Sequence, residues 1–194
     1  RALVALDIGP LGQLLEPTGT LSFEEAYEAF ARQVRAGAAA GADLAAIETM
    51  TDLAETRAAL LAVKENSALP VLCTMTFEGN GRTFTGCSVA AMALTLTGLG
   101  ADAIGINCSL GPRELLPLAE ELRRWTHLPL VMKPNAGLPE PGSNRYDIGP
   151  GEFGEAMARL AELGVQVLGG CCGTTPEYIA ALKDAVKAVP FTRQ

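Results

Sequence analysis

Three cysteines of the chain stand where their thiols could bind one metal ion. Cys108 directly follows an apolar run, and the adjacent Cys171 and Cys172 lie between glycines that let the backbone turn both sulfurs in one direction. Thiolates bind zinc at about 2.3 Å, and three protein ligands with one open position are typical of a catalytic zinc site. The spacing includes no Cys-x-x-Cys pair, so by itself it leaves buried, unreactive thiols as an equally good interpretation.

The remaining cysteines, Cys73 and Cys87, lack a partner motif and are predicted to be small apolar side chains of the core. An odd total of five cysteines argues against a disulfide framework. Adjacent Cα atoms lie about 3.8 Å apart, whereas a relaxed disulfide usually needs at least about 4.4 Å, so Cys171 and Cys172 are predicted to stay unbridged. Free thiols indicate a reducing compartment, and we expect the protein in the cytoplasm.

Short apolar runs alternate along the chain with longer helical patterns. The predicted strands are residues 3–7, 43–48, 71–77, 103–107, 130–133 and 166–169. The predicted helices are residues 22–40, 52–66, 88–99, 112–126, 151–163 and 175–189. Ser22, followed by an acidic first turn, predicts a helix N-cap, and Pro112 and Pro176 suit a first helical turn. Strands that are apolar throughout are typical of a parallel sheet covered by helices.

Polar and glycine-rich segments follow several predicted strands, which favours a (β/α)₈ TIM-type barrel with its site at one rim. An open doubly wound sheet would place its site mainly at one switch point. A complete barrel needs about 200–250 residues. The six βα units in 194 residues therefore predict a barrel that lacks its first two units. We expect residues 1–194 to be one domain and a fragment of a longer chain, with the irregular segment 134–150 folded over the site.

The charge pattern argues against two classes of partner. The chain has 22 acidic and 15 basic residues, a net charge of −7, and its basic residues do not cluster. Binding to nucleic acid or to an anionic membrane surface is therefore not expected. Its apolar runs also stay shorter than the roughly 18 residues needed to span a bilayer, so we predict no membrane segment.

Two cysteine-containing motifs resemble those of a known family. Residues 105–112 (GINCSLGP) and 169–176 (GGCCGTTP) are similar to the zinc motifs of the homocysteine S-methyltransferase family. Residues 133–139 (KPNAGLP), 146–148 (YDI) and 5–12 (ALDIGPLG) add to the likeness, which covers essentially the whole chain. Within that family, the chain looks most like the homocysteine-binding domain of cobalamin-dependent methionine synthases.

This resemblance implies both a fold and an activity. It implies a (β/α)₈ barrel with zinc on Cys108, Cys171 and Cys172, which binds homocysteine as a zinc thiolate and methylates its sulfur to give methionine. It further implies methylcobalamin as the donor, bound by a separate domain, with cobalamin- and folate-binding domains in the same or another chain as partners. The chain has no Asp-x-His-x-x-Gly signature of a cobalamin-binding domain.

One part of the family pattern is missing from this sequence. Family members begin with a strand and an Asp-Gly-x-x-Gly-Thr turn that helps hold the amino-acid end of the substrate. No such turn precedes the first predicted strand here. Its absence is the second reason to expect a fragment.

The resemblance also suggests residues that contact the substrate. Glu48, at a strand end, is predicted to bind the substrate ammonium, although an ordinary salt bridge is the alternative. Asn107 is predicted either to bind the substrate or to orient the turn before Cys108. Lys133 and Asn135 either line the site or hold the loop, and Asp7 has no assigned role. The single histidine, His127, is predicted to lie on the surface.

Two alternative functions remain open at the level of sequence. One is methyl transfer to homocysteine directly from S-methylmethionine or a betaine, because donor contacts lie largely outside the motifs. The other is a non-catalytic structural zinc module. Structural zinc sites usually have four protein ligands, so a fourth ligand would favour that class.

Overall fold

A computed structural model describes residues 2–139, 142–143 and 145–190 of the chain. Helices and strands alternate in the order β1 (Ala5–Ile8), α1 (Phe23–Ala39), β2 (Leu44–Met50), α2 (Leu53–Asn66), β3 (Val71–Met75), α3 (Val89–Gly98), β4 (Ala103–Asn107), α4 (Pro112–Trp125), β5 (Leu130–Lys133), α5 (Pro150–Glu162), β6 (Val167–Leu168) and α6 (Pro176–Val186). All six predicted strands and all six predicted helices are confirmed, with shifts only at their ends.

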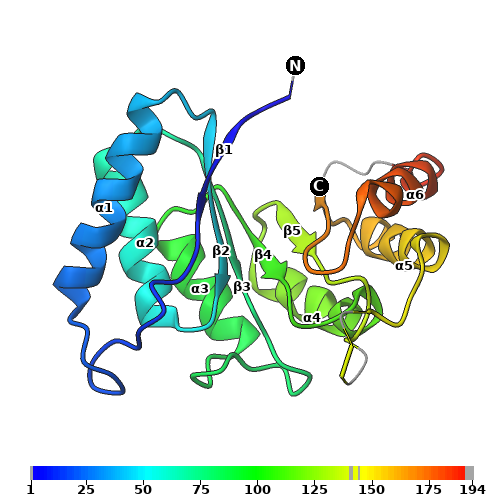
Figure 1. Cartoon of the computed structure of the whole chain (residues 1–194), viewed down its shortest axis with the longest axis horizontal. Coiled ribbons are helices and arrows are strands. Elements are labelled where there is room, and N and C mark those ends of the chain that lie inside the picture. The colour runs from blue at the N-terminus through cyan, green and yellow to red at the C-terminus, as the bar shows by residue number, and fades with distance from the viewer. Residues whose placement is uncertain (1, 140–141, 144, 191–194) are drawn as a thin grey trace.

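The strands form one parallel sheet whose order is the order of the chain, β1-β2-β3-β4-β5-β6. Each helix packs against the next one, and Figure 1 shows α1–α3 beside one half of the sheet and α4–α6 beside the other. A doubly wound sheet reverses its strand order at a switch point, whereas a barrel does not. The described part of the chain is therefore wound in one direction only, as the βα units of a barrel are.

The ends of the sheet differ slightly from the predicted bounds. The first strand begins at Ala5 rather than residue 3, because the Val4 N–H donates to the Asp43 carboxylate (2.8 Å) instead of continuing the ladder. Leu3 and Val4 are accordingly 68% and 63% exposed. The last strand is only two residues long and ends before Gly169.

Helix starts follow the predicted chemistry. Ser22 caps α1 through a reciprocal capping box with Glu25, and the Asp52 side chain accepts the Glu55 N–H at the start of α2. Pro112 and Pro176 occupy the first positions of α4 and α6. These residues fix where the loops that follow the strands enter the helices.

The register of the sheet determines which strand residues face the helices. Leu6 lies against Gly37 of α1, and its neighbours Ala45 and Ile47 in β2 are buried in the core. Successive side chains of a strand alternate between faces. The opposite, concave face therefore carries Asp7, Glu48, Asn107 and Lys133, all at or near carboxyl ends of strands.

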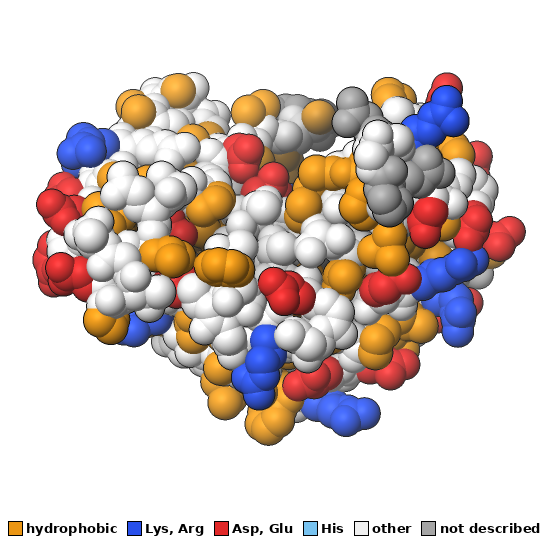
Figure 2. Space-filling model, turned by 60° about the horizontal axis from the view of Figure 1, so that its bottom comes forward, with side chains coloured by type: hydrophobic (Ala, Val, Ile, Leu, Met, Phe, Trp, Pro, Cys, Tyr) orange, Lys and Arg blue, Asp and Glu red, His pale blue; other side chains and the backbone are white. Residues whose placement is uncertain are grey.

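On the face drawn in Figure 2, the described residues form no single region of basic charge. In this view, the Lys and Arg side chains lie in separate places among acidic and hydrophobic side chains. Among the described helices, none is both long and apolar enough to cross a membrane.

Candidate metal centre

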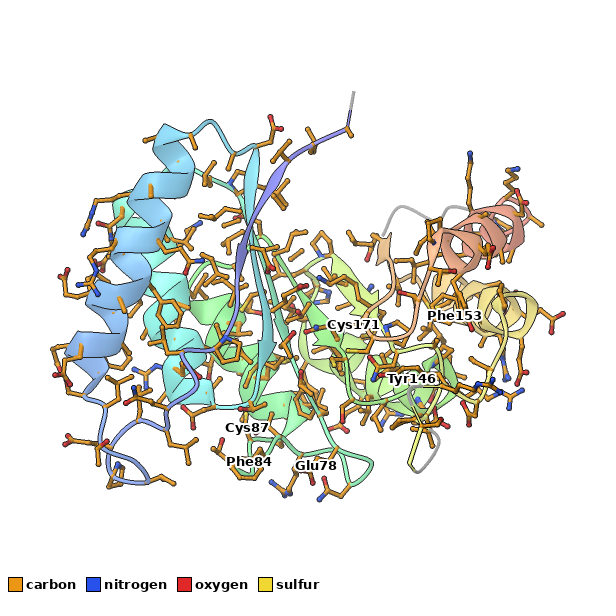
Figure 3. All side chains as sticks on the ribbon, viewed as in Figure 1. Glu78, Phe84, Cys87, Tyr146, Phe153 and Cys171 are labelled. Carbon is orange, nitrogen blue, oxygen red and sulfur yellow. The ribbon has the colours of Figure 1, made fainter. Side chains whose placement is uncertain are left out.

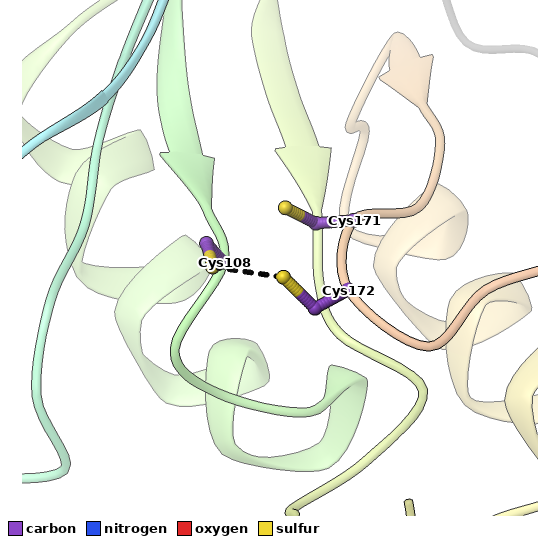
Figure 4. A group of neighbouring side chains, drawn as sticks. All are labelled: Cys108, Cys171 and Cys172. Atoms are coloured by element: carbon purple, nitrogen blue, oxygen red, sulfur yellow. Dashed lines mark hydrogen bonds between the residues drawn. The ribbon is translucent and has the colours of Figure 1, made fainter. Parts of the chain in front are cut away.

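The three predicted cysteine ligands meet at the carboxyl ends of β4 and β6 (Figure 4). The Sγ atoms of Cys108 and Cys172 are 3.7 Å apart, and all three Sγ atoms lie within 4.8 Å of one another. Four ligands at 2.3 Å from a tetrahedral zinc ion are separated by about 3.8 Å. The Cys108–Cys172 pair therefore has the separation of two zinc ligands, and the third sulfur is close enough for all three to bind one ion.

The turn after β4 orients the Cys108 side chain through an unusual backbone conformation. Cys108 and Ser109 both have left-handed conformations, with φ of 63° and 60°. Such values are uncommon for residues other than glycine. The Cys108 N–H still pairs with the Lys133 carbonyl (3.0 Å), so the turn begins while the chain is anchored to β5.

The turn after β6 is held by the segment that follows β5. The Cys171 N–H donates to the Pro134 carbonyl (2.8 Å), and the Cys172 N–H donates to the Asn135 side chain (3.1 Å). In return, the Ala136 N–H donates to the Cys172 carbonyl (2.9 Å). The predicted placement of segment 134–150 against the site is confirmed for its described residues, and Asn135 holds the cysteine pair in place.

The same segment brings Tyr146 over the cysteine turn. Gly173 has a left-handed φ of 78°, and a Cβ there would strike the Tyr146 ring. Partial burial and the nearby Cys172 both raise the pKa of Tyr146. Figure 3 shows Tyr146 and Cys171 in the same region, whereas Cys87 and Phe84 lie in a different loop.

The clustered thiols differ in acidity because they interact. A hydrogen bond from Cys171 lowers the pKa of Cys108 to about 7, and the same interaction, together with burial, raises the pKa of Cys171. The metal-free centre therefore favours a thiolate at Cys108 stabilised by a protonated Cys171. Cys73 lies in the core, where burial raises its pKa, and Cys87 packs against the core; neither joins the cluster.

Asn107 lies fully buried beside the cysteines and uses all of its hydrogen-bonding positions. Its Oδ1 accepts from the Thr49 N–H (2.8 Å) and the Thr74 hydroxyl (2.7 Å). Its Nδ2 donates to the Thr49 hydroxyl (2.9 Å) and to the Cys171 sulfur (3.8 Å). The side chain thus joins β2 and β3 to the metal centre.

Thr49 is a site residue that the sequence did not reveal. Its φ of 62° is an outlier for a β-branched residue, and the pairing of β2 with β3 becomes irregular between Ile47 and Met50. Asn107 bonds both the backbone N–H and the hydroxyl of Thr49, which holds this conformation. Sequence pattern carries no signal for it, because β-branched residues favour ordinary strand backbone.

Glu48, next to Thr49, forms an ion pair with Lys133 at the end of β5. Burial lowers the pKa of Lys133, while the neighbouring Cys171 and Asp7 groups act in the opposite direction. His127 is exposed, as predicted. The structure thus brings Glu48, Lys133, Asp7 and the cysteine centre to one rim.

Fold and site together define an α/β protein with a parallel six-stranded sheet and a cluster of three cysteines that could hold a metal ion at the carboxyl ends of its strands. Residues 1–186 match the family model described as homocysteine S-methyltransferase. The chain belongs to the homocysteine S-methyltransferase family.

Relatives within this family include two mycobacterial proteins. The chain is 33% identical over 187 residues to a methionine synthase of Mycobacterium leprae (strain TN), covering 92% of this chain and 15% of the relative. It is 37% identical over 154 residues to a methionine synthase of Mycobacterium tuberculosis (strain ATCC 25618 / H37Rv), covering 75% and 13%. The chain thus spans about a seventh of the length of these relatives.

Solved structures of one enzyme share the fold. The apo form of the homocysteine methyltransferase MmuM from Escherichia coli superposes with a TM-score of 0.77 at 30% identity, covering 94% of this chain and 63% of that one. Its metallated form gives a TM-score of 0.68 at 28% identity, covering 81% and 51%.

Proposed function

We propose that this chain is the zinc- and homocysteine-binding part of a homocysteine S-methyltransferase that forms methionine. The observation that carries the proposal is the clustering of three Sγ atoms after β4 and β6, close enough together to be three ligands of one tetrahedral ion. A structural zinc site would usually have a fourth protein ligand. The cluster found among the described residues has three, which favours a corner that is left for the substrate.

Zinc bound there would lower the pKa of a substrate thiol and hold it as a nucleophilic thiolate toward a methyl donor. The protein's part is to supply negative charge and fixed geometry. Three cysteine thiolates carry one more negative charge than the ion neutralises, which keeps the sulfur electron-rich. Asn107 and Asn135 hold the two cysteine turns by the hydrogen bonds described above. We assign Asn107 a positioning role, because its polar atoms are already bonded within the protein.

The methyl donor is proposed to be methylcobalamin carried by another domain, with a folate-binding domain as a further partner. Support comes from the relatives, which are methionine synthases several times longer than this chain. Direct transfer from S-methylmethionine or a betaine is the alternative donor chemistry. A cytoplasmic location is proposed as well, since the five cysteines are all free.

Glu48 is proposed to bind the ammonium group of homocysteine from the end of β2. In the full-length zinc-loaded protein, Glu48→Gln is expected to weaken homocysteine binding by roughly 1–3 kcal/mol, the usual range for loss of a charged partner. Zinc content should stay the same, since Glu48 does not belong to the cysteine cluster. Calorimetric titration with homocysteine measures the affinity of the wild type and of the Glu48→Gln variant.

The matched control is Glu120→Gln, an exposed carboxylate of α4. It should bind homocysteine as the wild type does. If the wild type takes up zinc but no homocysteine, the proposed function is wrong. If the wild type binds homocysteine and Glu48→Gln binds it equally well, Glu48 only forms a salt bridge with Lys133 and does not bind the substrate.

We also propose that further strands close this sheet into a barrel in a longer polypeptide. Among the described residues, β1 and β6 each have one unpaired edge, and β1 leaves Ala5 and Asp7 exposed. Open edges invite association between chains. Residues 1–194 expressed alone are therefore expected to self-associate in sedimentation velocity, whereas the longer polypeptide should not. A monodisperse monomer with a sharp unfolding transition would contradict barrel closure by missing strands.

A further inference from the structure

The ion pair between Glu48 and Lys133 spans the inside of the curved sheet. Glu48 belongs to β2 and Lys133 to β5, and β3 and β4 lie between them. Three strand intervals measure roughly 14 Å in a flat sheet, which two side chains on one face bridge only when the sheet curves toward them. The pair therefore lies within the concave face, at the rim where the cysteines also stand.

This pair is more enclosed than the others in the described part of the chain. The Lys133 and Glu48 side chains are 24% and 26% exposed, whereas every other ion pair of that part has both side chains at least 36% exposed. Asp7 adds negative charge near Lys133. A half-buried cation among carboxylates and thiols is held at this place by its ionic partners.

Binding of an ammonium group to Glu48 would take that partner away from Lys133. Leaving a partly buried charge unpaired is costly. A ligand that carries a carboxylate beside its ammonium removes the cost, because one protein ion pair is replaced by two between protein and ligand. A thiol with only one of these charges would leave either Lys133 or Glu48 without a partner.

We propose that Lys133 binds the carboxylate of the substrate, so that Glu48 and Lys133 together select a zwitterionic amino-acid thiol. This inference rests on the proposed function, because it concerns the substrate of the same site. Lys133 thereby becomes a specificity-determining residue, and its pair with Glu48 is the state before substrate binds.

The test uses three thiols that differ only in charged groups. They are homocysteine, 3-mercaptopropan-1-amine, which lacks the carboxylate, and 4-mercaptobutanoate, which lacks the ammonium. Their affinities for the full-length zinc-loaded protein are measured by calorimetry in wild type and in Lys133→Met, Lys133→Arg and Glu48→Gln. Lys64→Met is the matched control, because Lys64 pairs with Asp102 at the amino end of β4, whereas Cys108 follows the carboxyl end of the same strand.

Lys133→Met is expected to lower the affinity for homocysteine and for 4-mercaptobutanoate about ten- to a hundredfold, the range for losing a charged hydrogen-bond partner. It should leave the affinity for 3-mercaptopropan-1-amine unchanged or higher. Glu48→Gln should give the opposite selectivity. Lys133→Arg should keep most of the homocysteine affinity, because it retains the charge, and zinc content should not change in any variant.

An equal loss for all three thiols in Lys133→Met, or no loss for any, would overturn this inference and leave the proposed function intact. Failure of the wild type to bind any thiol would overturn the proposed function and this inference with it. Should Lys133→Met not fold, as judged by circular dichroism, Lys133→Gln and Lys133→Arg supply the same comparison. The preference for thiols that carry a carboxylate must then be kept in Lys133→Arg and lost in Lys133→Gln.

Discussion

Replacing Cys108 or Cys172 with alanine is expected to remove zinc almost completely from the full-length protein. Each supplies one of three clustered sulfurs, and two remaining thiolates cannot fix a tetrahedral ion. The affinity should fall by far more than the 10–100-fold that is usual for residues which only support a metal ligand. Metal analysis by mass spectrometry after dialysis against a weak chelator measures the loss.

Cys73→Ala and Cys87→Ala are the matched controls, since these cysteines lie outside the cluster. Both variants should retain about one zinc per chain. The double variant Cys171→Ala/Cys172→Ala is the strictest case, and full zinc occupancy there would rule out the three-cysteine centre.

Replacing Asn107 with leucine is expected to destabilise the domain by about 2–5 kcal/mol, because the Thr49 N–H loses its acceptor and the buried Thr74 hydroxyl keeps only a long hydrogen bond (3.4 Å) to the Ile47 carbonyl. The Thr49 N–H and the Thr74 hydroxyl both donate to Asn107 Oδ1, and the Thr49 hydroxyl accepts from its Nδ2. The left-handed backbone of Thr49 would also lose its support. Urea unfolding of the zinc-loaded and metal-free proteins measures the change in free energy of unfolding.

Thr76→Val provides the control for this network. It removes only the hydrogen bond from the Thr76 hydroxyl to the Asn107 carbonyl (3.0 Å) and should cost about 1 kcal/mol. An Asn107→Leu variant that unfolds within about 1 kcal/mol of wild type would show that the network does not hold the site together.

Much of the architecture could be predicted from local chemistry. Apolar runs of strand length, the Ser22 cap and the prolines at Pro112 and Pro176 placed all six βα units, because these signals act within a few residues of the chain. The clustering of the three cysteines could be predicted for a similar reason. Cys108 directly follows β4, the Cys171–Cys172 pair follows β6 after two glycines, and the carboxyl ends of parallel strands meet at one rim.

The relations between side chains from different strands could not be predicted in this way. Asn107 and Thr49 are 58 residues apart, so their hydrogen bonds depend on the register of β2, β3 and β4. The left-handed Thr49 is held by that register against its own preference for extended backbone. The pairing of Glu48 with Lys133 depends further on the curvature of the sheet across three strand intervals.

The amino-acid sequence alone therefore determined the order of the elements and which three cysteines cluster, since capping, periodicity and turn chemistry are local. Only the tertiary structure decided that Asn107 is buried with all its polar atoms bonded and that Lys133 lies against Glu48. Both outcomes arise from the packing of strands far apart in the chain. Hydrogen bonding and ion pairing there depend on distances that no local pattern encodes.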